Sequence, residues 1–96
     1  MPVYYYNWPA QLKVVVDRFY SFTGELTDMR KKAVLLAAAW DDTSTVFEIV
    51  KAYYDRICEY MQFQDCGTVY GRGCGSLSMT QRTPYPQKAY ELGKSL

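Results

Sequence analysis

Residues 33–39 read Ala-Val-Leu-Leu-Ala-Ala-Ala, an unbroken apolar run in a chain of 96 residues. A continuous apolar run of this length between polar flanks favours a strand that is buried on both faces, as in a parallel sheet. A short polar loop, residues 40–44, follows, and Thr45 and Glu48 then stand in the spacing of a capping box, which predicts a helix that extends to about Met61. The apolar face of this helix carries Phe47, Val50, Tyr54, Ile57, Cys58 and Met61.

A second short strand is predicted downstream, at residues 66–70. It ends in residues 71–75, Gly-Arg-Gly-Cys-Gly, whose spacing differs from the G-x-G-x-x-G of a dinucleotide-binding turn. We interpret this stretch as a flexible loop and expect an irregular segment as far as Arg82. Pro84 or Pro86 then opens a final helix, which carries Ala89, Tyr90 and Leu92.

Upstream of the apolar run, residues 9–22 have the spacing of an amphipathic helix, with Pro9 in the first turn and Asn7 or Trp8 at the cap. Lys13 and Asp17 are spaced to form an ion pair on its polar side. Thr23-Gly24 breaks the pattern, so residues 25–32 are predicted to be a polar connector. The predicted apolar stripe consists of Leu12, Val15, Val16, Phe19 and Tyr20.

The predicted order is helix, strand, helix, strand, helix, which defines an α/β class. A crossover of about 25 residues between the two strands implies that they pair in parallel. Two strands are too few for a normal sheet, and three amphipathic helices need more sheet than two short strands provide. We therefore expect another copy or another chain to complete the sheet, and favour a homo-oligomer, a dimer or higher, formed through the open sheet edge.

Composition excludes several classes of protein. Eleven basic residues against ten acidic ones leave a net charge of +1 with no basic stripe, which argues against nucleic-acid binding. No apolar run is long enough to cross a bilayer. The absence of histidine removes Cys-His and Ser-His catalysis and most metal sites. The irregular spacing of Cys58, Cys66 and Cys74 fits free thiols in a reducing cytoplasm, with Cys58 in the core.

The strongest functional signal is residues 2–13, Pro-Val-Tyr-Tyr-Tyr-Asn-Trp-Pro-Ala-Gln-Leu-Lys, followed by Asp17-Arg18-Phe19. This stretch resembles the NADPH-dependent FMN reductase family of flavodoxin-like proteins. In that family a strand ends in Pro-x-Tyr, and Pro-Ala-x-Leu-Lys…Asp-Arg opens the third helix. Residues 31–36, 47–60 and 89–94 resemble, in the right order, the fourth strand, the fourth helix and the last helix of the family.

The resemblance implies a doubly wound parallel sheet that holds FMN in loops at the carboxyl ends of its strands, with NAD(P)H as the electron donor. It implies no catalytic side chain and no metal, because FMN performs hydride transfer and the protein orients it. The implied cofactor-binding residues lie in two loops and are Pro2, Tyr4, Tyr5, Tyr6, Asn7, Trp8, Trp40, Asp41, Asp42 and Thr43.

Each loop also has a simpler interpretation. Clustered tyrosines and a tryptophan are often core or oligomer contacts. Asp41 and Asp42 resemble paired carboxylates for acid–base or metal chemistry, but at a helix start they more often interact with the helix dipole and with water. We favour that second role for both aspartates. For the aromatic residues, composition alone favours the contact role, and the resemblance favours a position in the loop but not flavin binding itself.

The chain departs from the family in one respect. Its 96 residues include no Ser/Thr/Gly-rich phosphate loop, and Met1-Pro2 falls where the family has the end of its third strand. We therefore interpret residues 1–96 as a single partial domain, the C-terminal part of the fold, derived from an internal start codon or a natural truncation. FMN binding is expected to be weak. The alternative is a non-enzymatic oligomerising α/β domain, or a remnant without catalytic activity.

Overall fold

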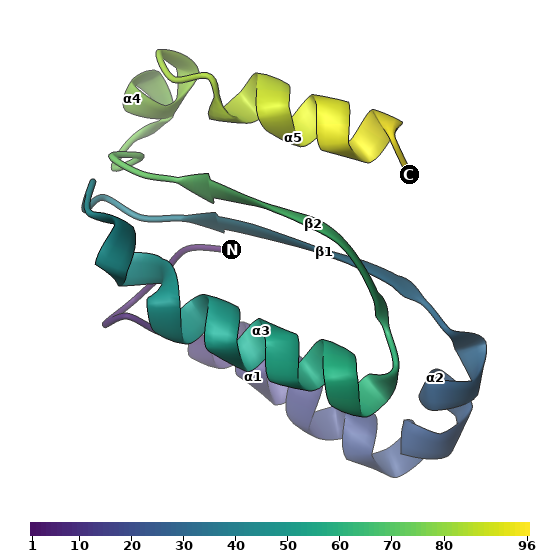
Figure 1. Cartoon of the computed structure of the whole chain (residues 1–96). Helices are drawn as coiled ribbons and strands as arrows, with labels where there is room; N and C mark the ends of the chain where they lie inside the picture. Colours follow the sequence, from purple (N-terminus) through teal and green to yellow (C-terminus); the bar gives the residue numbers. More distant parts are fainter.

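Two parallel strands, β1 (Lys32–Ala38) and β2 (Gln64–Gly71), form the centre of the computed structural model, which describes residues 1–96 (Figure 1). Their register runs from Lys32 opposite Gln64 to Ala38 opposite Gly71, with one irregularity between Ala33 and Leu35. The α/β class and the parallel pairing are confirmed. Both strands lie where the sequence predicts them, although β2 is longer at both ends.

A third extended segment lies beside the end of β1. Pro2 forms a parallel bridge with Ala38, and the backbone amides of Val3 and Ala38 each donate a bond of 2.9 Å across the pair. The α-amino group of Met1 donates to the carbonyl oxygen of Leu36 over 2.5 Å, in the position that a strand amide would occupy. The sheet therefore has three parallel segments over its last few residues and two over the rest.

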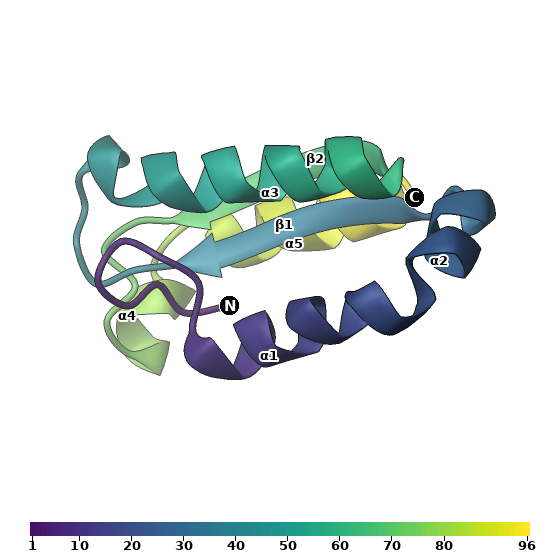
Figure 2. The same ribbon diagram turned by 90° about the horizontal axis from the view of Figure 1, so that it is seen from below.

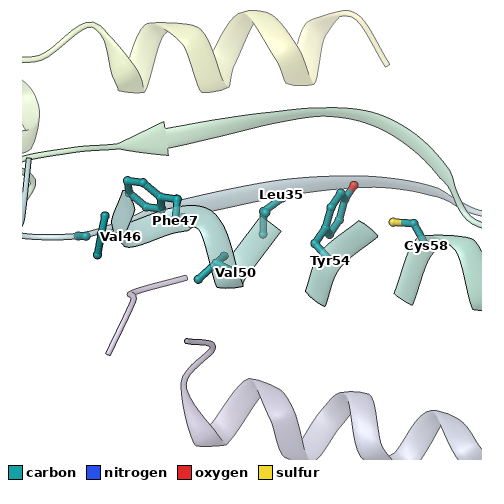
Figure 3. Packing of buried hydrophobic residues seen from close by; sticks show 8 residues of the cluster. Leu35, Val46, Phe47, Val50, Tyr54 and Cys58 are labelled. Atoms are coloured by element: carbon teal, nitrogen blue, oxygen red, sulfur yellow. The ribbon is translucent and has the colours of Figure 1, made fainter. Parts of the chain in front are cut away.

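Helices lie on both faces of this sheet. Helices α1 (Ala10–Asp17) and α3 (Glu48–Met61) cover one face, and α5 (Tyr85–Lys94) lies over β2 on the other (Figures 1 and 2). This layered arrangement places the main core between α3 and β1 (Figure 3). The core consists of Leu35, Ala37, Ala39, Val46, Phe47, Val50, Tyr54 and Cys58.

The expectation that β1 is buried on both faces is wrong. Leu35 and Ala37 are buried under α3, whereas Leu36, which points the other way, remains 43% exposed. The reason is that α5 packs against β2 and leaves the neighbouring part of β1 without a helix above it. The predicted apolar face of α3 is confirmed, except that Ile57 is only half-buried.

The first helical region differs from the prediction. A 3-10 helix, η1 (Arg18–Phe22), follows α1, and α2 (Thr23–Met29) occupies most of the expected connector. The Thr23 hydroxyl donates to the Phe19 carbonyl oxygen over 3.0 Å, so this residue continues the helical path instead of breaking it. In the predicted stripe only the central residues face the sheet. Val15 and Tyr20 lie at its two margins and are 51% and 89% exposed.

Two further local predictions are corrected. The capping box does not form, because a 3-10 turn, η2 (Ser44–Phe47), precedes α3 and no side chain caps it. A short helix, α4 (Leu77–Gln81), replaces part of the expected irregular segment, and the Ser76 hydroxyl oxygen accepts a bond of 3.2 Å from the Met79 amide at its start. The final helix is confirmed, with Pro84 at its cap.

Candidate functional site

The carboxyl ends of the parallel strands point to one edge of the sheet, where three loops gather (Figure 2). Pro2, Ala38 and Gly71 lie side by side across the sheet, because Ala38 pairs with both of the others. Since the three segments are parallel, the residues that follow leave the sheet side by side. The structure therefore brings together the loop of residues 4–8, the loop of residues 40–43 and the loop of residues 72–76.

The first loop is a tight reverse turn with unusual backbone geometry. Tyr4 and Asn7 exchange two backbone hydrogen bonds of 3.3 and 3.1 Å, which leaves Tyr5 and Tyr6 as the two central residues. Both have positive φ angles, 49° and 66°, as in a type I′ turn, where asparagine and glycine are preferred. Side chains larger than asparagine are strained there. All three tyrosine rings are exposed, and Tyr5 is 98% exposed.

Trp8 has a different environment from the tyrosines. It packs against the core, its ring lies edge-on to that of Tyr53 with centroids 4.8 Å apart, and its Nε1 donates to the carbonyl oxygen of Val50. The Asn7 side chain also bonds within the loop, because its Oδ1 accepts a hydrogen bond of 2.8 Å from the Trp8 amide. Trp8 therefore anchors the loop, while the three tyrosine rings remain exposed.

The second loop presents one large exposed ring. Trp40 is 77% exposed and follows β1 directly. The Asp41 carboxylate bonds within its own loop, because its Oδ1 accepts a hydrogen bond of 2.7 Å from the Thr43 amide. This bond lowers the pKa of Asp41. Asp42 is exposed, and the hydroxyl oxygens of Thr43 and Thr45 lie 3.2 Å apart. This geometry agrees with the expected loop role of Asp41.

The third loop was not predicted to belong to the site, and it is not an independent flexible loop. The amide of Gly73 donates to the Asp41 carbonyl oxygen over 3.2 Å, and the amide of Cys74 donates to the Ala39 carbonyl oxygen over 2.8 Å. Gly73 has a φ of 66°, which suits glycine. The available signal was the recurrence of glycine at every second position from Gly71 to Gly75.

None of the three main cavities is lined by Tyr4, Tyr5, Tyr6 or Trp40, although Trp8 lines the second one. The largest, about 990 Å³, runs along the free edge of β2 between α3 and α5, and includes Ser44 and Arg72 at its loop end. A second, of about 400 Å³, lies between α1 and α3 and has only apolar residues around it. A third, of about 310 Å³, lies between β1 and α5. A ligand at Tyr5 and Trp40 would therefore rest on an open surface.

The groups at the loop edge suit a flat ring better than a phosphate. Four exposed aromatic rings are present, but Arg72 is the only cationic side chain in the three loops. No group of histidine, cysteine or acidic residues is arranged to hold a metal ion. None of the helices has the length and apolar character needed to cross a membrane. The three loops thus present exposed flat rings and one cationic side chain, and they hold no cluster of cationic groups that could anchor a phosphate.

Comparison of the chain with protein-family models, with curated proteins and with solved structures found no match.

Proposed function

We propose that this chain is the ring-binding, C-terminal part of a flavodoxin-like domain of the NAD(P)H-dependent FMN oxidoreductase type. The observation that carries this proposal is that Pro2, Ala38 and Gly71 pair side by side at the carboxyl ends of parallel segments. Exposed aromatic rings from two loops therefore lie at the same end of the sheet. Ligands of open α/β sheets bind at this edge.

The topology supports the same fold. The extended segment at Met1–Val3, β1 and β2 are adjacent and parallel in chain order, α1 and α3 lie on one face, and α5 lies on the other. A doubly wound sheet has helices on both faces in this way. In such a domain β1 and β2 correspond to the fourth and fifth strands, and Met1–Val3 corresponds to the end of the third.

The chemistry assigned to the chain is orientation of a flat ring. Exposed tyrosine and tryptophan rings stack on planar ligands, and the strain at Tyr5 and Tyr6 is the kind that ligand-binding loops retain. When bound, FMN accepts hydride from NAD(P)H, and the protein supplies position and surroundings. Each missing charge-assisted bond to the phosphate weakens binding by about 1.5–3 kcal/mol, so FMN has little advantage over riboflavin here.

The test is a fluorescence titration of the 96-residue protein with riboflavin and with FMN. We expect both to bind weakly, with dissociation constants within about tenfold of each other, because the phosphate adds few contacts. Trp40→Ala should weaken both, whereas Tyr20→Ala, which removes another highly exposed ring outside the loops, should weaken neither. Equal effects of the two substitutions, or no flavin binding at millimolar concentration, would reject the proposal.

A second candidate, favoured by the apolar groove of about 400 Å³, is a non-enzymatic self-associating domain. The groove lies against β1, whose edge has no neighbouring strand over Lys32–Leu35, and Leu36 is exposed on the opposite face. A second copy that covered these surfaces would remove an aggregation-prone edge. Light scattering after gel filtration tests this candidate: Leu36→Lys should shift a dimer to a monomer, and a monomeric wild-type protein at high concentration excludes it.

A further inference from the structure

Gly75 lies directly against the indole ring of Trp40. A Cβ atom added at Gly75 would stand 1.9 Å from Cδ1 of Trp40 and 2.7 Å from its Nε1, closer than any real contact. The five-membered edge of the indole therefore rests on the bare backbone of Gly75. The rest of the ring faces solvent, which accounts for the high exposure of Trp40.

The backbone on both sides of Trp40 is held by the same loop. Ala39 accepts the Cys74 amide bond and Asp41 accepts the Gly73 amide bond, at 2.8 and 3.2 Å. These two bonds hold the third loop against the second at Gly73 and Cys74, directly before Gly75. An indole supported at its base and open on its other side has the geometry of a stacking platform.

Glycine is required at positions 73 and 75 for different reasons. Gly73 has a positive φ, which alone favours glycine, whereas the backbone of Gly75 lies outside that left-handed region. Alanine can therefore adopt the backbone conformation of Gly75, and what excludes it is the space taken by Trp40. A Gly75→Ala substitution consequently tests the contact with the indole and not the strain of the turn.

We infer that Gly75 is a positioning residue that fixes the Trp40 indole as a stacking platform, and that the loop after β2 is thereby a third part of the ring-binding site. The class of ligand is a flat aromatic ring. Its identity as a flavin rests on the proposed function, whereas the positioning of Trp40 by Gly75 does not.

The experiment compares wild-type protein, Gly75→Ala and the control Gly24→Ala, each with and without Trp40→Ala. Gly24 lies in α2 with no atom within 4 Å of an added Cβ, so it controls for the methyl group. The contribution of Trp40 to near-ultraviolet circular dichroism and to acrylamide quenching is the difference between each protein and its Trp40→Ala counterpart. Lumiflavin, which has the ring without a phosphate, is the ligand probe.

We expect Gly75→Ala to abolish the circular dichroism band of Trp40 and to raise the dissociation constant of lumiflavin about tenfold, as for one lost stacked ring. Gly24→Ala should change neither. Where Gly75→Ala also lowers stability, Trp40→Ala in the same chain should restore it, because the clash is then gone. Loss of stability that Trp40→Ala does not restore would assign the effect to another contact and overturn the inference.

The spectroscopic measurement needs no ligand, so it separates the two proposals. An unchanged Trp40 band in Gly75→Ala overturns the inference whether or not flavins bind. Lumiflavin that binds wild-type protein and Gly75→Ala equally also overturns it, and leaves the proposed function in place. A lost Trp40 band in a protein that binds no flavin upholds the positioning of Trp40 and rejects the flavin function.

Discussion

The Nε1–H group of Trp8 donates a hydrogen bond to the backbone carbonyl oxygen of Val50, with 3.2 Å between nitrogen and oxygen. Val50 is fully buried at the centre of the core, and Trp8 belongs to the short loop before α1. The bond therefore ties the aromatic loop to α3 at a point far away in the chain. It explains how an otherwise exposed and strained turn keeps a defined position.

Trp8→Phe should lower the free energy of unfolding by about 1–2 kcal/mol, because it removes this hydrogen bond and part of the buried ring area. Trp40→Phe changes an exposed ring and should stay within about 0.5 kcal/mol of wild type. Urea denaturation followed by far-ultraviolet circular dichroism measures both. A Trp8→Phe protein as stable as Trp40→Phe would mean that the bond to Val50 contributes nothing.

Tyr54→Phe should be destabilising by about 1.5–3 kcal/mol, the usual range for a bond to a charged group. The buried Tyr54 hydroxyl donates to Oδ1 of Asp65 over 3.0 Å, and the same oxygen accepts the Gly67 amide at 3.0 Å. This carboxylate thus joins α3 to the start of β2. Asp65→Asn, which retains an acceptor oxygen without the charge, should cost less than Tyr54→Phe in the same urea experiment.

Tyr70→Phe should have the opposite effect and raise the free energy of unfolding by up to about 1 kcal/mol. The Tyr70 ring stacks on Phe47 with centroids 4.8 Å apart, but its buried hydroxyl has no hydrogen-bond partner. Thr68 influences the pKa of Tyr70 less than burial does and is not in hydrogen-bonding geometry with it. Since the ring contact is kept in phenylalanine, a loss of stability in Tyr70→Phe would show that the hydroxyl has a partner after all.

Stability should fall at alkaline pH. Burial raises the pKa of Tyr54, of Tyr70 and of the Cys58 thiol, so the folded protein keeps protons that the unfolded chain releases from about pH 8.5 to 10 upwards. The stabilisation that these three groups contribute is therefore fully present below about pH 8.5. Above that pH the free energy of unfolding falls by up to about 1.4 kcal/mol per pH unit for each group. Urea titrations between pH 7 and 10.5 measure the slope, which Tyr70→Phe should reduce. A constant free energy across this range would contradict the expectation.

Much of the fold could be predicted because local patterns and long-range packing agree. The run at residues 33–39, the apolar face of α3 and the proline before α5 each indicate the element that forms. The helix α2 was missed because Thr23-Gly24 suggests a break, whereas the Thr23 and Thr27 hydroxyls donate to carbonyl oxygens one turn back, over 3.0 and 2.7 Å, within a continuous helical path.

The site was only partly predictable. That loops after parallel strands share an edge follows from topology, so the meeting of the Tyr4 and Trp40 loops could be expected. Which aromatic residues pack inward and which stay exposed could not be predicted. The partial burial of Trp8 depends on α3, and the orientation of Trp40 depends on Gly75. Both contacts join segments that are distant in the sequence and leave no local pattern.

The turn at Tyr5 and Tyr6 should show a conflict between stability and binding. Tyr5→Asn combined with Tyr6→Gly places in the two positive-φ positions the residues that a type I′ turn prefers. Relief of strain at two positions should raise the free energy of unfolding by about 1–3 kcal/mol. The same change removes two exposed rings, so the affinity for riboflavin should fall by about tenfold or more.

The matched control is Tyr5→Phe combined with Tyr6→Phe, which keeps both rings and the strained backbone. It should leave stability and riboflavin binding close to those of wild type, because both side chains are exposed and the change removes only their hydroxyl groups. If the Asn-Gly turn gained stability without losing riboflavin, the tyrosine rings would have no part in binding. The strain at the two left-handed positions would then need an explanation other than ligand binding.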